Sequence, residues 1–198
     1  QTKSLTSESN SINQKLTGRK YYFTSTLRGS VYFKDEWCRG RVLLENGDRY
    51  DNVYMKYNTL IEDLIVFNER TGVIYILDKF LVSEFEMLTD SISGSTEYFR
   101  KLFVDMYPRG DRYFNVLYEG EKIDLLVWHK TNEVRVTVYR DKSNLLRDTE
   151  FQLGKSYFLR YPDGHLKRIS PKRRSFINLF PEQKREIRRL LRRNQIYF

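Results

Sequence analysis

Short apolar segments separated by tight-turn sequences run through residues 21–169, and this alternation most constrains the fold. In residues 53–57, large apolar side chains alternate with polar ones, which is the period of a half-buried strand. Asn46-Gly47 follows a similar segment and favours a two-residue hairpin turn. Other predicted turns are Asn68 to Gly72, Glu119-Gly120, Lys130 to Glu133 and Pro162-Asp163-Gly164. With 15% aromatic residues, which favour strands, the chain is predicted to be mainly β and antiparallel.

The polar stretch 89–96 is the one convincing internal boundary. We therefore expect two β meanders that form a sandwich- or barrel-like body, closed by a short helical C-terminal segment. The expected parts are a flexible leader at 1–20, meanders at 21–88 and 97–169, and a basic helical segment at 170–198. Residues 21–198 are expected to form one compact unit.

The positive charge of the chain is concentrated in its last 44 residues. From Lys155 onward there are 13 Lys and Arg against 3 Asp and Glu, a net charge of +10. The rest of the chain holds the other 22 of 35 basic and 23 of 26 acidic residues, a net of −1. A basic segment on a neutral body indicates an anionic partner.

The basic segment contains the signals of two helices. Ser170-Pro171 is predicted to start the first helix, with the serine as its cap, and Pro181 is predicted to end it and open the second. Glu182 would lie in the first turn of that second helix. An apolar face expected to pack on the body is formed by Ile187, Leu190 and Leu191. The candidate anion-binding face consists of Arg185, Arg188, Arg189, Arg192 and Arg193.

This arginine face has several possible roles. It can bind nucleic acid, an acidic protein or anionic lipid headgroups, or it can simply be the solvated side of a helix. No helix-turn-helix spacing, zinc finger or RNP-like aromatic motif accompanies it, which argues against nucleic acid. Three large apolar residues are too few for stable membrane insertion of the helix.

The compartment is indicated only indirectly. No stretch approaches the ~18 apolar residues of a membrane span. The polar residues 1–17 and the absence of an initiator Met resemble the start of a chain after removal of an export signal. The single cysteine, Cys38, excludes an internal disulfide. We expect an exported chain, periplasmic, outer-membrane-associated or secreted, with a cytoplasmic location left open.

Catalytic and metal-binding motifs are missing from the sequence. His129 and His165 are predicted to flank turns, in no ligand spacing, and Cys38 cannot complete a zinc set. There is no GxSxG elbow and no phosphate-binding glycine loop. The sequence therefore predicts no cofactor, no metal and no catalytic residue.

Carboxylates are the one chemical group in surplus. Paired carboxylates can serve glycoside hydrolysis, although adjacent acids more often line turns. The pairs are Asp35 and Glu36, Asp48 and Asp51, and Glu62 and Asp63. Trp37 and Trp128 are candidates for stacking on a ligand such as a sugar, with a place in or beside the core as the alternative.

Several segments carry a resemblance to a known group. They are residues 29–37, 40–42, 46–47, 50–53, 56–58, 116–120, 125–126, 157–159 and 179–182 with the basic helix after them. Together they resemble exported proteins of Bacteroidetes-type bacteria, over about residues 29–88 and 113–194. The resemblance implies export after signal cleavage and implies no activity.

These observations favour a non-enzymatic exported envelope or secreted module that binds or scaffolds an unknown ligand. One alternative is a binder of nucleic acid or an acidic partner through the arginine face. A weaker alternative is a carbohydrate-active enzyme that uses the early carboxylates.

Overall fold

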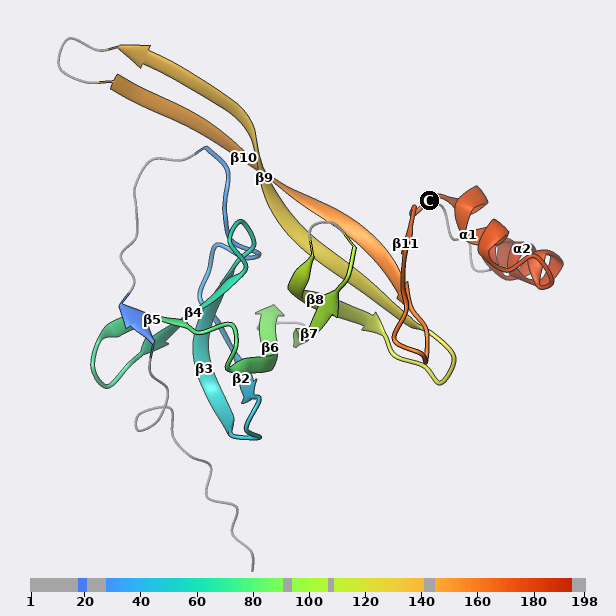
Figure 1. The fold of residues 1–198 in the computed structure, drawn as a ribbon, viewed down its shortest axis with the longest axis horizontal. Helices are drawn as coiled ribbons and strands as arrows, with labels where there is room; N and C mark the ends of the chain where they lie inside the picture. The colour runs from blue at the N-terminus through green and yellow to red at the C-terminus, as the bar shows by residue number, and fades with distance from the viewer. Residues whose placement is uncertain (1–17, 21–27, 91–93, 107–108, 141–144, 194–198) are drawn as a thin grey trace, which may run out of the picture.

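The computed structural model describes residues 18–20, 28–90, 94–106, 109–140 and 145–193. These residues form one antiparallel sheet of 11 strands followed by two short helices (Figure 1). The predicted mainly β fold with a helical C-terminal segment is confirmed. The sheet is open, with β1 at one edge and β11 at the other, and is not closed into a barrel. Most of the predicted leader, residues 1–17, lies outside the described residues.

From β2 onward, the elements follow one another along the chain with short connections. The strands are β1 (Arg19–Lys20), β2 (Cys38–Leu44), β3 (Arg49–Asn58), β4 (Asp63–Asn68), β5 (Val73–Leu77), β6 (Val82–Asp90), β7 (Ser95–Val104), β8 (Gly110–Tyr118), β9 (Asp124–Arg140), β10 (Leu145–Arg160) and β11 (Leu166–Ile169). The helices are α1 (Arg173–Leu179) and α2 (Lys184–Arg193).

The strand order is β1-β5-β4-β3-β2-β6-β7-β8-β9-β10-β11. Strands β7 to β11 are a simple meander, whereas β2 lies between β3 and β6. Gly40 permits this central packing, because a Cβ at this position would lie 1.8 Å from the carbonyl oxygen of Glu86. Strand β6 also pairs with β7, so the sheet is continuous across the predicted boundary at 89–96, of which residues 91–93 lie outside the described residues.

The predicted turn at Lys130 to Glu133 is wrong, because β9 runs through it as one strand of 17 residues. Thr131 is buried there, and its backbone N–H donates to the carbonyl oxygen of Thr59 at 3.1 Å. The two threonine hydroxyls are 2.7 Å apart. The polar residues that suggest a turn therefore anchor the β3–β4 connection to β9. Figure 1 shows the far ends of β9 and β10 extending beyond the sheet as a two-stranded arm.

The hydrophobic core changes from one face of the sheet to the other at β8. Tyr113 and Phe114 are consecutive, so their side chains point to opposite faces. Tyr113 belongs to a large cluster drawn mainly from β2 to β7, in which the rings of Phe85 and Phe99 stack with centroids 4.7 Å apart. Phe114 belongs to a smaller cluster with Phe158 and residues of β7, β9 and β11.

The helical segment departs from the sequence prediction at its start. Lys172, and not Ser170, precedes the first turn of α1, and it makes no side-chain cap. Glu186, and not Glu182, is the acidic residue in the first turn of α2, and Arg192 and Arg193 lie in its last turn.

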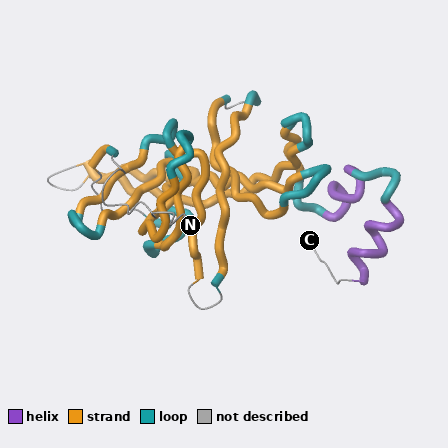
Figure 2. The backbone as a smooth tube through the Cα atoms, turned by 90° about the horizontal axis from the view of Figure 1, so that it is seen from below, coloured by secondary structure: helices purple, strands orange, loops and turns teal. Residues whose placement is uncertain are grey.

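The helix pair lies beyond the sheet, at the end of the molecule where β11 lies (Figures 1 and 2). The element that α2 mainly contacts is α1. The predicted docking of α2 on the sheet through Ile187 is therefore wrong. The side chains of the other two residues of that apolar face, Leu190 and Leu191, lie outside the described part of the chain.

Candidate functional site

A basic groove lies between the two C-terminal helices. Its cavity has a volume of about 600 Å³. The lining residues are Arg174, Ile177 and Asn178 from α1 and Lys184, Arg188 and Arg192 from α2. Four of these six side chains are cationic and none is acidic. We call this site the α1–α2 groove.

Helical spacing explains why these residues meet. Lys184, Arg188 and Arg192 are four residues apart, which places them one above another on a single face of α2. The α1 residues are spaced by three and four positions and also share a face. Ile177 is only 5% exposed and gives the groove an apolar floor. The groove thus combines four charged groups with one apolar contact.

The structure divides the predicted arginine face into two parts. Arg188 and Arg192 line the groove, whereas Arg185, Arg189 and Arg193 are exposed on the neighbouring flank of α2 and do not line it. Sequence reasoning missed Arg174 and Lys184. The four-residue spacing of Lys184 from Arg188 was a usable signal, but the contribution of α1 depends on how the two helices pack.

The charges of the groove are not neutralised by the protein. In the part of the chain that the structure describes, no ion pair or side-chain hydrogen bond involves Arg174, Lys184, Arg188 or Arg192. Like charges placed this close repel one another, so an anion that enters the groove relieves this repulsion as well as forming new contacts.

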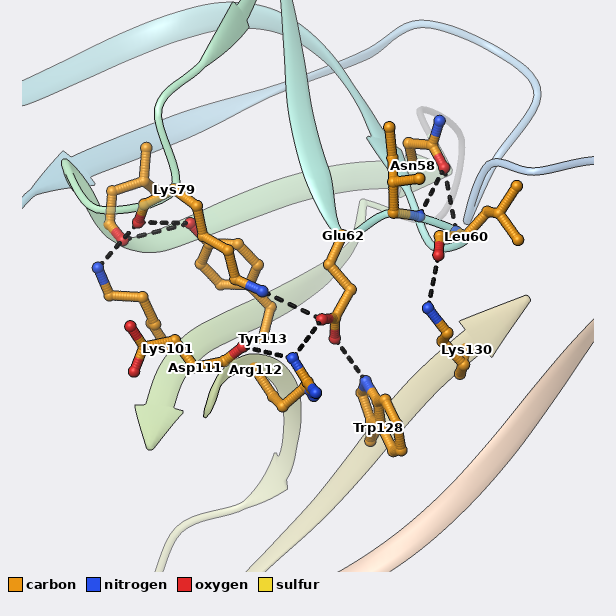
Figure 3. A network of polar contacts seen from close by, with 12 residues as sticks. Asn58, Leu60, Glu62, Lys79, Lys101, Asp111, Arg112, Tyr113, Trp128 and Lys130 are labelled. Carbon is orange, nitrogen blue, oxygen red and sulfur yellow. Dashed lines mark hydrogen bonds and ion pairs between the residues drawn. The ribbon is translucent and has the colours of Figure 1, made fainter. Parts of the chain in front are cut away.

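A second basic region has the opposite character, because it surrounds a buried carboxylate (Figure 3). Glu62 lies in the β3–β4 connection with a φ of 60° and is 4% exposed. Its carboxylate accepts hydrogen bonds from Lys79 Nζ at 3.0 Å and Arg112 Nη1 at 3.1 Å. It also accepts one from Trp128 Nε1 at 2.6 Å. We call these four residues the Glu62 network.

Neighbouring polar contacts fix the same connection. Asn58 Oδ1 accepts the backbone N–H groups of Leu60 and Ile61 at 3.0 and 3.3 Å. Lys130 donates to the carbonyl oxygen of Leu60 (Figure 3), and burial lowers the pKa of this lysine. The basic side chains around Glu62 are thus used to join β3 and β4 to β8 and β9.

The two tryptophans occupy different environments. Trp128 is half-buried against the smaller core cluster, and its indole N–H is already bonded to Glu62. Trp37 lines a separate cavity of about 250 Å³ together with Tyr54 and Phe67, and its ring lies 5.9 Å from that of Phe67. The structure therefore does not bring the two candidate stacking residues into one cavity.

Among the other early carboxylates, Asp51 forms ion pairs with residues of β2 and β3. Asp51 accepts from Arg41 at 2.7 Å and from Arg49 at 3.2 Å, and the hydrogen bond from Arg41 is the main cause of its lowered pKa. Burial raises the pKa of Asp63. None of the six carboxylates lines the α1–α2 groove, the Trp37 cavity or the cavity beside His129 described below.

The structure also shows where the remaining candidate nucleophiles and metal ligands lie, namely the two histidines and the cysteine. His129 was expected beside a turn, but it is 5% exposed in the middle of β9. His165 is exposed in the β10–β11 turn. Cys38 is buried, and burial raises the pKa of its thiol. Across the described ranges, no cluster of three or more His, Cys, Asp or Glu side chains is positioned to hold a metal ion.

Among the described residues, neither helix is long and apolar enough to cross a membrane. Comparison of the whole chain with protein-family models, with curated proteins and with solved structures found no match of any of the three kinds. The case for function therefore depends on the geometry and charge of the sites themselves.

Proposed function

We infer that this chain is a non-enzymatic binding module, and that its α1–α2 groove takes an acidic segment of a partner protein. The observation that carries this proposal is the set of four cations in one groove, none of them paired within the described residues. Arginine suits such a role because its planar guanidinium binds a carboxylate through two parallel hydrogen bonds.

Two properties favour an acidic protein segment over nucleic acid. The floor of the groove contains Ile177, so an apolar side chain flanked by carboxylates fits it better than a phosphate chain does. Residues 1–154, which include most of the sheet, have a net charge of −1, so a long polyanion would gain little from contact with them.

The direct test is binding of a labelled peptide in which glutamates flank one leucine, measured by fluorescence anisotropy at ~0.1 M salt. Arg188→Glu combined with Arg192→Glu reverses two charges in the groove. We expect at least a ~10-fold loss of affinity, because charge-assisted hydrogen bonds are each worth ~1.5–3 kcal/mol.

The matched control is Arg185→Glu combined with Arg189→Glu. It makes the same charge change at the same spacing on the same helix, but outside the groove. We expect it to weaken binding only a few-fold, through long-range electrostatics. Equal losses in the two double variants would contradict a specific groove. Tighter binding of single-stranded DNA than of the peptide would favour the nucleic-acid alternative.

The compartment forms a further part of the proposal. The resemblance to exported bacterial proteins supports a role in the envelope or outside the cell. Fractionation of cells that express the full-length gene tests this directly, and recovery of the protein in the cytosol with an uncleaved N-terminus would refute it.

A further inference from the structure

A third cavity lies on the sheet face that carries the large core cluster, beyond the end of that cluster. Its volume is about 290 Å³, and strands β7 to β10 form its floor. Phe33 and Lys34, from the segment before β2, form its lip. Floor residues from β8 to β10 alternate along their strands and therefore point to this same face. We call it the Asn115 cavity, after the most buried polar residue in it.

Asn115, which lines this cavity, has an unsatisfied acceptor. The residue is 1% exposed, and its amide nitrogen donates to Glu97 Oε2 at 2.6 Å. Since a carboxylate only accepts, this bond fixes the orientation of the amide. Asn115 Oδ1 is buried and has no hydrogen-bond partner. A buried carbonyl left unpaired costs ~1–3 kcal/mol, so its presence calls for a ligand or a functional explanation.

His129 adds a second unsatisfied group. Its Nδ1 is buried and also has no hydrogen-bond partner. Burial, assisted by the charge of Lys155, lowers the pKa of this imidazole to about 4. The ring is therefore neutral near pH 7 and can offer one donor and one acceptor.

Charges of both signs surround these two groups. The charged lining residues are Glu97 and the exposed Lys34 and Lys155. Neither lysine forms an ion pair or side-chain hydrogen bond within the described residues. Apolar lining is supplied by Phe33, Val127 and Leu153.

We propose that the Asn115 cavity binds a small zwitterion of the α-amino-acid type with an apolar side chain. The ammonium group donates to Asn115 Oδ1 and meets Glu97, while the carboxylate lies between Lys34 and Lys155. A simple anion would face Glu97 without compensation, and a simple cation would face two lysines. The cavity volume is at the lower end of the range for ligand sites, so the ligand is small.

Calorimetric titration of the full chain with L-leucine and L-valine tests the proposal. We expect saturable binding of at least one of them, one molecule per chain. Leucinamide lacks the carboxylate and N-acetyl-leucine lacks the ammonium group. Each should bind at least ~10-fold more weakly than leucine, because each loses a charge-assisted hydrogen bond.

Lys155→Gln provides the decisive variant. It should weaken leucine binding ~10-fold and leave leucinamide binding unchanged, since only the carboxylate contact is lost. Lys122→Gln, an exposed lysine in the β8–β9 turn, is the matched control and should change neither affinity. Absence of saturable binding up to solubility, or equal binding by Lys155→Gln and the unaltered chain, would overturn the proposal.

Discussion

Trp128 and His129 are consecutive on β9, and their side chains enter polar environments of opposite kinds. Trp128 donates to the Glu62 carboxylate, which has two further donors in Lys79 and Arg112. On the other face, His129 Nδ1 and Asn115 Oδ1 are buried without partners. Three donors that converge on one buried carboxylate stabilise the fold, whereas unsatisfied groups beside a cavity are available to a ligand.

The same contrast applies to the two basic regions. The cations Lys79 and Arg112 are partly buried and paired with one carboxylate, while those of the α1–α2 groove have no acidic partner within the described residues. Basic residues alone therefore do not identify a binding surface. A basic region whose cations are paired with a carboxylate of the fold is structural, whereas one whose cations have no such partner can bind a ligand.

The largest effect is expected for Glu62→Gln. It removes the negative charge that pairs with Lys79 and Arg112, whose side chains are only 23% and 17% exposed. Breaking a buried ion pair from one side costs ~3–5 kcal/mol, so urea unfolding should show a loss of this size. Glu121→Gln, at an exposed position, should stay within ~0.5 kcal/mol. Similar midpoints for both variants would show that the Glu62 network is not structural.

The next effect concerns the pH dependence of stability through His129. Its native pKa is about 4, below the usual 6.5, so the unfolded chain binds a proton that the native chain does not between these values. Stability should fall as the pH drops through this window, by up to ~3 kcal/mol at ~1.4 kcal/mol per pKa unit.

The contribution of His129 is isolated by comparing urea unfolding of the unaltered chain with that of His129→Gln from pH 7 to pH 4.5. In His129→Gln, the free energy of unfolding should lose the additional dependence on pH that His129 contributes. His165→Gln removes an exposed histidine and should retain this additional pH dependence. A slope unchanged by His129→Gln would mean that the imidazole is not held neutral on its face of β9.

A smaller effect is expected for Trp128→Phe, which keeps an aromatic ring but removes the indole N–H. A hydrogen bond to a charged group is worth ~1.5–3 kcal/mol. Combined with Glu62→Gln, the loss should be less than the sum of the two single losses, because the two groups share one contact. Strict additivity in this double-mutant cycle would contradict the direct bond between them.

The sequence predicted those parts of the molecule that local pattern determines. The hairpin at Asn46-Gly47 is present, with Gly47 at a φ of 86° that a tight turn requires. The turn predicted at Lys130 to Glu133 failed because Thr131 is satisfied by Thr59, 72 residues away. Local polarity cannot distinguish a solvated turn from a strand with a distant polar partner.

Prediction of the candidate sites was limited in the same way: residues close in the sequence were found, and contacts between distant residues were missed. Arg188 and Arg192 were found because both lie on one helix with a clear period. Glu62 and Trp128 are 66 residues apart, and their contact exists only once the sheet has formed. Asn115 and His129 were not recognised as a pair, because their shared cavity requires adjacent strands in register and the lip before β2.

The smallest effect should come from Asp51→Asn, which removes an ion pair at the surface. The side chains of Arg41 and Asp51 are 38% and 39% exposed, so solvent screens their attraction and we expect a loss of ~0.5 kcal/mol or less. Since the native pKa of Asp51 is lowered from 3.8, this contribution is present above that pH and disappears as the pH falls through the native value. Salt at ~1 M should also reduce it, whereas the loss from Glu62→Gln should persist because buried pairs are screened much less. Urea unfolding of both variants at low and high salt measures the difference. If Asp51→Asn costs as much as Glu62→Gln, burial does not separate the structural carboxylate from the surface one, and the distinction between the two kinds of charge fails.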